Sequence, residues 1–409
     1  MTVVNKLKKY SFGLLLFVYL LIASHGFNFI GWSFIVPQSV DYLVASTLLL
    51  CAFLFSRSAS KVRRPLGLII ASILILPIFS VIFKLILGSN ESLNIEIQYT
   101  FIPIASFSLY YIMRKLKVDI TTIMTTLIIF GLLTFILQIY QQFYPESILF
   151  AGNENLDEPE KLIRNGIYRL DVGSVSVALV CMYYYWGKLL TEKFHWYNIT
   201  MLSIFITSVY FYLTRQIIVA TLLTIGISLF LHRSNRNIRS IILIVILSSV
   251  LLVFYFEELF GELIELTQDN THSQDIRFEF IGVILSASIQ NPLQFLFGHG
   301  GYTTIEKVWA DKEYFVSDVG FFGTMWQYGF IYLLVYFYTF YLFAYKYGKQ
   351  IPLFIRLYLI GTSINSMFIF PYRNALENYV WVMMLYVISC YYNRKTNNTN
   401  EIQCYNTCV

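Results

Sequence analysis

The chain has 409 residues, of which 57% are hydrophobic and only 13% are charged, and its formal net charge is +5. Because a soluble domain usually carries about 25% charged residues, this composition excludes an ordinary soluble enzyme. Many apolar blocks reach the roughly 20 residues that a helix needs to cross a bilayer. Backbone groups in lipid must be satisfied within their own segment, so these blocks are predicted to be helices. The expected fold class is an all-α polytopic integral membrane protein.

In chain order, the sequence predicts one transmembrane domain, 1–409, with about twelve crossings. These cover residues 11–36, 40–56, 65–87, 98–113, 119–143, 171–190, 197–213, 216–231, 240–256, 319–344, 351–370 and 376–393. The first block follows the basic segment KLKK but lacks a clean small-residue cleavage site, so we expect an uncleaved helix rather than a signal peptide. Two connections are long, at 144–170 and 257–318.

Lysine and arginine in the connections set the orientation, because cytoplasmic loops are enriched in them. With both termini in the cytoplasm, 20 of the 29 basic residues lie inside and 9 lie outside. This orientation predicts a multi-pass protein of a plasma membrane, with both long loops on the outer side. Five outer arginines have no role in setting the orientation: Arg164, Arg169, Arg215, Arg277 and Arg373.

Arg215 is the only charged residue between Tyr197 and Leu231. It lies in a tight turn, TRQ, between two predicted crossings. One interpretation is snorkelling, in which a long side chain at a helix end reaches the headgroups. The other is an anion site, since arginine stays charged and matches phosphate with two parallel hydrogen bonds. Five outer arginines together with two long outer loops favour the anion site.

The loop 257–318 contains apolar residues at helical spacing in IRFEFIGVILSASI, which predicts a helix in the outer interface with Arg277 in its first turn. Asn291–Pro292 ends that pattern. The segment FGHGGYTT follows, and its glycines permit close approach of a ligand to the backbone. His299 in this segment is a candidate acid, base or phosphate donor. Alternatively, the glycines only form a turn and His299 is a solvated loop residue.

Asp318 immediately precedes the predicted helix 319–344. It is a candidate general base at the mouth of the outer cavity. Ser317 or Asp318 would also make a good helix N-cap, and a capping carboxylate is a weaker base because its pKa is lowered.

Three segments resemble the O-antigen polymerase and O-antigen ligase superfamily of bacterial inner membranes. TRQ at 214–216 is similar to a short arginine motif that these proteins carry after an outer turn. RFEFIGVILSASIQNPLQFLFGHGGY at 277–302 resembles an arginine, a helix, Asn-Pro-Leu and a glycine-rich turn. SDVGFFGTMWQYGFIY at 317–332 resembles the segment in which ligases carry a catalytic histidine. This chain has Asp318 at that position, which favours a polymerase of the Wzy type over a ligase.

The resemblance implies a metal-independent glycosyltransferase with a GT-C-like helical bundle and no cofactor. It would join undecaprenyl-diphosphate-linked repeat units on the outer side of the inner membrane, during synthesis of an O-antigen, lipopolysaccharide or capsule. For that reaction we expect Arg215, Arg277 and Arg373 to bind the diphosphate. Arg164 and Arg169 would hold the acceptor glycan, and His299 or Asp318 would serve as base. The expected partners are the lipid-linked oligosaccharide, membrane lipid and a chain-length regulator protein.

Three other functions compete with this interpretation. A ligase differs only in its acceptor. A lipid-linked oligosaccharide flippase has about twelve helices and the same ligands, but the sequence has neither the internal repeat that a transporter predicts nor short outer loops. An acyltransferase predicts intramembrane histidine and arginine near the inner half. The sequence contains no P-loop, HExxH or Asp-x-Asp motif, and nothing in it indicates a nucleic-acid partner.

Overall fold

The fold was analysed in a computed structural model of the chain. It describes residues 3–23, 46–48, 50, 65–86, 93–144, 163–164, 167–168, 175–192, 194–212, 215–231, 271–299, 316–367 and 375–396.

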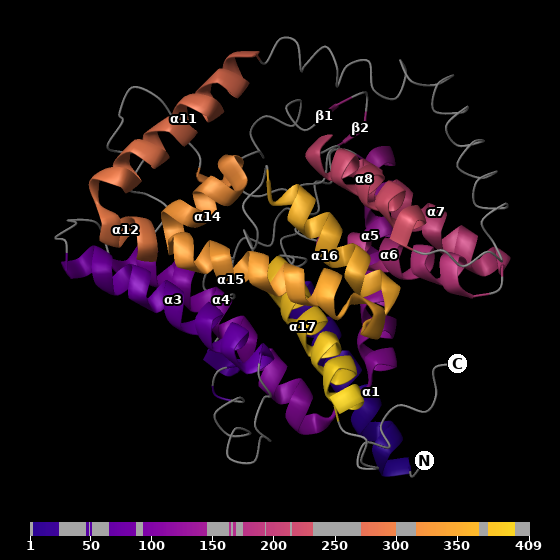
Figure 1. Cartoon of the computed structure of the whole chain (residues 1–409). Helices are drawn as coiled ribbons and strands as arrows, with labels where there is room; N and C mark the ends of the chain where they lie inside the picture. Colours follow the sequence, from indigo (N-terminus) through magenta and orange to yellow (C-terminus); the bar gives the residue numbers. More distant parts are fainter. Residues whose placement is uncertain are drawn as a thin grey trace.

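The described part of the chain is almost entirely helical (Figure 1). In chain order its elements are α1 (Val3–Ala23), α3 (Leu66–Ile86), α4 (Leu93–Leu116), α5 (Ile120–Phe143), β1 (Ile163–Arg164), β2 (Ile167–Tyr168), α6 (Val175–Thr191), α7 (Trp196–Phe211), α8 (Arg215–Leu231), α11 (Thr271–Gln290), α12 (Pro292–Phe297), the 3-10 helix η3 (Val316–Val319), α14 (Gly320–Tyr328), α15 (Phe330–Phe340), the π-helix η4 (Tyr341–Lys346), the 3-10 helix η5 (Gly348–Gln350), α16 (Leu353–Asn365) and α17 (Ala375–Thr396).

The helices coincide closely with the predicted apolar blocks wherever the structure describes them. The predicted helix 119–143, for example, is α5, and Asp119 caps it by accepting from the backbone of Thr121. The block 240–256 and most of 40–56 lie outside the described residues. The block 319–344 is not one continuous helix, because Gly329 adopts φ 87° and separates α14 from α15.

Two described helices, α3 and α5, are long and apolar enough to cross a membrane. Four shorter apolar stretches have between 10 and 17 residues; they are Tyr10–Leu21, Gln216–Leu231, Phe330–Lys346 and Leu353–Asn365. The prediction of about twelve crossings therefore remains a prediction.

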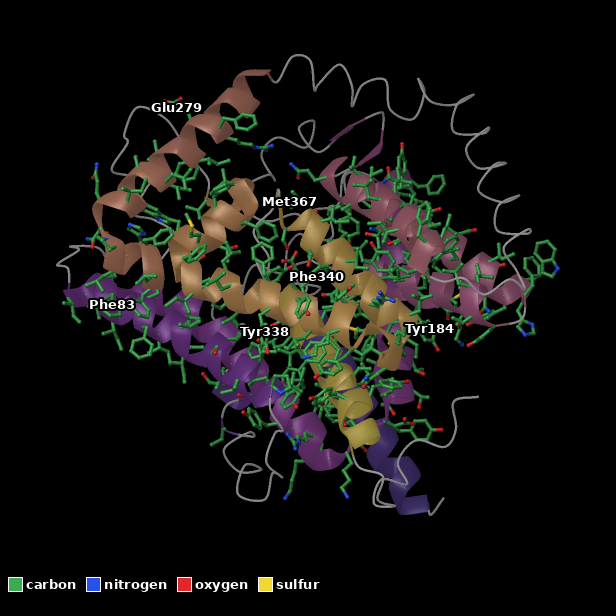
Figure 2. The ribbon with its side chains drawn as sticks, viewed as in Figure 1. Phe83, Tyr184, Glu279, Tyr338, Phe340 and Met367 are labelled. Carbon is green, nitrogen blue, oxygen red and sulfur yellow. The ribbon has the colours of Figure 1, made fainter. Side chains whose placement is uncertain are left out.

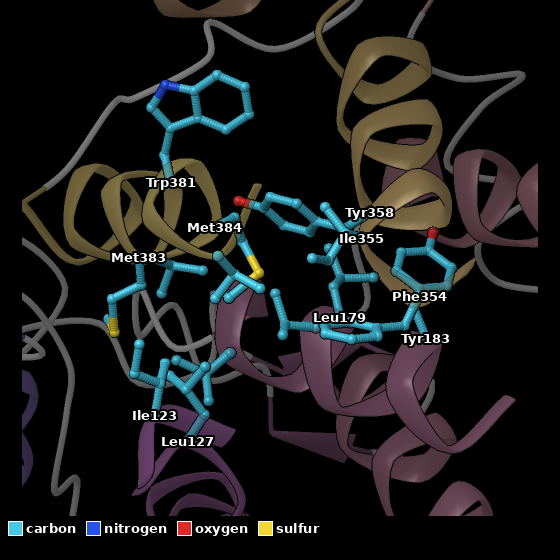
Figure 3. Packing of buried hydrophobic residues seen from close by; sticks show 14 of the residues in the cluster. Ile123, Leu127, Leu179, Tyr183, Phe354, Ile355, Tyr358, Trp381, Met383 and Met384 are labelled. Carbon is cyan, nitrogen blue, oxygen red and sulfur yellow. The ribbon is translucent and has the colours of Figure 1, made fainter. Parts of the chain in front are cut away.

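The main core lies between α5, α6, α16 and α17, and Figure 3 shows part of it. Met383 and Leu385 of α17 are fully buried there, and Tyr358 of α16 packs near Trp381. Glycines allow two of these helices to approach closely: a side chain at Gly361 of α16 would collide with the ring of Tyr183. This core holds α6, α16 and α17 together.

The helices of this bundle alternate in direction. Tyr183 of α6 contacts Gly361 and Gly187 contacts Phe354, so α6 and α16 are antiparallel. Trp186 of α6 donates to Ser228 of α8 at 2.7 Å, one turn after Tyr183 meets Thr224, so α6 and α8 are parallel. The bundle therefore has an Arg215 end, where α6 and α8 begin and α16 ends, and a Lys188 end, where α6 and α8 end and α16 begins.

A second core joins α11 to the rest of the described helices. Phe280 and Ile284 of α11 are buried against Val316, Val319 and Trp326. In Figure 1, α11 runs obliquely above α14, and α12 folds back from it onto α3. The predicted interfacial helix thus packs on the re-entering segment through one side, while Phe278 and Ile289 on it stay exposed.

The loop 144–170 contains a small β-ribbon that the all-α prediction missed. Strands β1 and β2 pair antiparallel, with Ile163 opposite Tyr168 and Arg164 opposite Ile167. Asn165–Gly166 separates the strands in the sequence, and Asn-Gly is the dipeptide favoured in two-residue hairpins. We missed the ribbon because two residues per strand are too few to show an alternating pattern.

Candidate functional site

Arg215 is the first residue of α8, as predicted from the TRQ turn. Helix α8 packs along α16, and because they are antiparallel, the start of α8 lies at the end of α16. That end of α16 carries Ser366 and Met367, whose backbone would collide with any side chain at Gly320. The start of α14 is therefore at the Arg215 end. Figure 2 shows Met367 in this region.

The β-ribbon with Arg164 also lies at the Arg215 end. Strand β2 contacts α5, and α5 runs parallel to α7, because Gly131 lies against Phe205 while Gln138, further along α5, exchanges hydrogen bonds with Ser208, further along α7. Figure 1 shows β1 and β2 beside α8. Arg169 and Arg373 lie outside the described residues.

Arg277 lies on α11, one turn before Phe280, and is half-buried. Phe280 packs against Val316 and Val319, which bracket Asp318 in η3. The second core therefore holds the helix of Arg277 against the short helix of Asp318. Since η3 leads directly into α14, both elements adjoin the Arg215 end.

The N-cap position of α14 is Val319, because η3 inserts a 3-10 turn between the loop and α14. The side chains of Ser317 and Asp318 lie outside the described part of the structure, so both the capping role and the role of Asp318 as a base remain predictions.

His299 is buried, contrary to the solvated-loop alternative. It is 7% exposed, and its ring stacks on Trp326 with centroids 3.5 Å apart and planes inclined by 7°. The pKa of His299 is lowered from 6.5 to about 4, chiefly because burial penalises the charged ring. A hydrogen bond with the backbone of Trp326 opposes this, and the nearby charge of Lys84 adds to it. At neutral pH, His299 is an uncharged imidazole.

Two glycines make the position of His299 possible. Gly298 and Gly329 both adopt φ 87°. The backbone around each of these glycines occupies the space that a side chain at the other glycine would need. This close approach lets the backbone N–H of His299 donate to the carbonyl of Trp326 at 2.7 Å. The glycine-rich motif therefore serves backbone contact between α12 and α14, as well as forming a turn.

Sequence reasoning missed Lys84, which is 3% exposed in the last turn of α3. It lies near His299, and Phe83 beside it stacks on Phe297 at 4.7 Å. Four residues earlier, Ser80 donates to the carbonyl of Gln327. The signal was present, because Lys84 is the only charged residue of α3, just as Arg215 is the only one from Tyr197 to Leu231.

The two candidate bases do not come together. Asp318 precedes α14, whereas His299 stacks on Trp326 near the other end of that helix. Eight residues separate 318 from 326, which corresponds to roughly 12 Å along a helix. Asp318 thus lies beside the helix of Arg277, towards the Arg215 end, and His299 lies near Lys84.

Within the described ranges, no group of three or more His, Cys, Asp or Glu side chains comes together as a metal site. In comparisons with known proteins, no protein-family model matches this chain, and no match was found among curated proteins.

Proposed function

We propose that this protein is a polytopic membrane glycosyltransferase that polymerises glycan repeat units carried on a polyprenyl diphosphate. In this proposal about twelve helices form a GT-C-like bundle in a bacterial inner membrane, with the Arg215 end outside. The observation that carries it is the gathering of α8 with Arg215, α11 with Arg277 and η3 with Asp318 around the end of α16.

The distribution of charge supports this orientation. At the opposite end of the bundle lie four basic residues in helix ends and turns: Lys188, Lys346, Lys349 and Arg356. Cytoplasmic loops are enriched in lysine and arginine. The Lys188 end therefore has the character of a cytoplasmic surface, and arginines at the other end need another reason.

The relative directions of the helices also support it. Parallel α6 and α8, antiparallel α6 and α16, and parallel α5 and α7 are the directions that an alternating series of crossings requires. The segment of α14 and α15 runs antiparallel to α3 and fits too, because Ser80 meets Gln327 of α14 while Leu76 packs with Tyr332 of α15. These directions follow from side-chain contacts and were not used in the sequence-based prediction.

The proposed chemistry needs cations where the leaving group departs. As the glycosidic bond of the donor breaks, its electron pair stays on the oxygen of the lipid diphosphate, and the acceptor hydroxyl oxygen forms the new bond. Arg215 and Arg277 would stabilise the developing charge. Charge-assisted hydrogen bonds contribute about 1.5–3 kcal/mol each, so two arginines account for a rate factor on the order of 10² or more.

Asp318 is the better placed of the two candidate bases for that reaction. It lies in η3, against the helix that carries Arg277. A carboxylate there would take the proton of the acceptor hydroxyl. His299 lies about the length of α14 away, which favours a different role for it.

Deleting the gene and separating surface glycans on a gel tests the function. Loss of a polymerase leaves lipid carrying single repeat units, loss of a flippase removes all surface repeats, and loss of a ligase leaves lipid-linked polymer unattached. The deletion strain is then complemented with Arg215→Ala, Arg277→Ala or Asp318→Asn. We expect each to shorten the glycans at wild-type membrane abundance, with at least a tenfold lower polymerisation rate.

Lys349→Ala is the matched control, because it removes an exposed cation at the Lys188 end. It should leave chain length unchanged. Arg215→Lys tests the need for two parallel hydrogen bonds, since an ammonium cannot form them with one phosphate. Long glycans in both Arg215→Ala and Arg277→Ala would rule out the assigned diphosphate site.

A further inference from the structure

We propose that Lys84, His299 and Trp326 form a second anion-binding site, which holds the diphosphate of one lipid-linked substrate while Arg215 and Arg277 hold that of the other. The inference rests on the proposed function, because joining two lipid-linked glycans requires two diphosphates to be bound at once. We call this group of residues, together with Gln327, the Lys84 site.

The Lys84 site contains buried polar atoms that the described residues leave without hydrogen-bond partners. These are Nδ1 of His299, Nε1 of Trp326 and Oε1 of Gln327, on side chains that are all more than nine-tenths buried. An unsatisfied buried polar group costs about 1–3 kcal/mol. Three such groups on adjoining residues destabilise the fold, and hydrogen bonds to a bound ligand would satisfy them.

The chemistry of the Lys84 site selects an anion. An indole N–H only donates, an ammonium only donates, and the amide of Gln327 offers donors when its oxygen and nitrogen exchange places. The one N–H of the neutral His299 ring is engaged with the backbone of Trp326, so the open Nδ1 can only accept, and a hydroxyl of the sugar attached to the diphosphate would satisfy it. Phosphate oxygens accept hydrogen bonds and carry the charge that complements Lys84, so a diphosphate fits the donors of Lys84 and Trp326.

The position of the Lys84 site indicates that the anion is carried by a lipid. Lys84 is in the last turn of α3, a helix long and apolar enough to cross a membrane. Ile82, Leu85 and Ile86 around it are exposed, as are Leu293 and Leu296 of the neighbouring α12. A charged site beside exposed apolar helix surface suits a headgroup whose chain remains in the bilayer.

The Lys84 site is separate from the arginines at the Arg215 end. Trp326 and Gln327 are at the far end of α14 from Gly320, which touches the end of α16. Gly320 and Trp326 are six positions apart, which corresponds to roughly 9 Å along a helix. Two anion sites that far apart allow two lipid carriers to bind with their sugars between them.

Native mass spectrometry of the full chain in detergent tests this, with geranylgeranyl diphosphate as the probe. The wild type should bind two molecules. Lys84→Met should bind one, with at least tenfold weaker binding of the second, and Lys84→Arg should restore two. Trp326→Phe, which keeps the stacked ring but removes the N–H, should also weaken the second. Lys188→Met is the matched control, since it removes a lysine from the last turn of α6 at the other end, and should bind two.

The outcomes separate the two proposals. If the wild type binds two and Lys84→Met also binds two, Lys84 has no part in a second site and this inference fails, while the polymerase proposal stands. If the wild type binds one, there is no second site. If it binds none, the polymerase proposal itself fails. Two molecules of inorganic diphosphate binding as tightly as the lipid would show a site for free anions and overturn the lipid assignment. Geranylgeraniol, which lacks the diphosphate, should not bind there.

Discussion

Trp186 and Trp326 are both buried tryptophans on helices that pack in a core, yet their polar atoms have different surroundings. The indole N–H of Trp186 donates to Ser228 at 2.7 Å, so it helps to fix α6 against α8. The indole N–H of Trp326 has no partner among the described residues, and its ring stacks on a buried imidazole. Both indole rings are almost fully buried, but only the N–H of Trp186 has a hydrogen-bond partner among the described residues. This difference in hydrogen bonding distinguishes a tryptophan that stabilises the core from one in a candidate binding site.

Gly298→Ala should break the Lys84 site most severely. The residue has φ 87°, which costs an alanine about 1–2 kcal/mol, and its new methyl group would meet the backbone of Gln327 and Gly329. Together with an overpacking cost of about 1–3 kcal/mol, we expect a loss of roughly 2–5 kcal/mol in the free energy of unfolding. Thermal unfolding in detergent measures it.

Gly282→Ala is the control for that change, because nothing lies within 4 Å of the added methyl group on α11. An alanine in a helix is about 1 kcal/mol more favourable than glycine, so this variant should be slightly more stable. Equal stability of the two variants would contradict the close approach of α12 and α14.

Acid should destabilise the protein through His299. The unfolded chain takes up a proton on this residue below pH 6.5, whereas the folded chain does so only near pH 4. The contribution of His299 to the free energy of unfolding is therefore constant above pH 6.5. It falls by up to about 3 kcal/mol as the pH drops from 6.5 to 4. Melting temperatures of the wild type and of His299→Gln, measured across this pH range, should become more alike as the pH falls, because only the wild type loses stability.

His195→Gln serves as the control for acid sensitivity, because the side chain of His195 is exposed. It should keep the wild-type dependence on pH. A His299→Gln protein with the same acid slope as the wild type would show that His299 is not a buried neutral imidazole.

Trp186→Phe should lower stability by about 1–3 kcal/mol, since it removes a buried hydrogen bond and part of a packed ring. Binding of geranylgeranyl diphosphate should remain at two molecules, as the change lies in the main core. Chemical or thermal unfolding, with mass spectrometry of the surviving folded protein, measures both effects. A loss of ligand at normal stability would mean that Trp186 is not purely structural.

Trp326→Phe should have the smallest effect on stability, within about 1 kcal/mol, because the loss of ring contact is offset by removal of an unsatisfied donor. Its effect on the second lipid should nevertheless exceed that of Trp186→Phe. If Trp326→Phe is more destabilising than Trp186→Phe and leaves lipid binding intact, then Trp326 has a structural role and not a binding role.

Much of the helical arrangement could be predicted from the apolar blocks. Helices α3, α5 and α8 begin and end within a residue or two of the predicted limits, because uninterrupted apolar runs flanked by polar residues leave little freedom in where a helix ends. The break at Gly329 and the ribbon at 163–168 were missed. A single glycine within a helical pattern is tolerated in many helices, so its φ depends on what the neighbouring backbone demands.

The candidate site was predicted less completely than the helices. The sequence by itself determined that Arg215 stands at the start of an apolar helix, since charge in such a segment must lie near its end. It equally marked Lys84, which we did not single out. Only the tertiary structure decided that His299 is buried on Trp326, that Asp318 and His299 lie at opposite ends of α14, and that Lys84 adjoins His299. Those facts depend on packing between α3, α12 and α14, and contacts between residues more than 200 positions apart leave no local pattern in the chain.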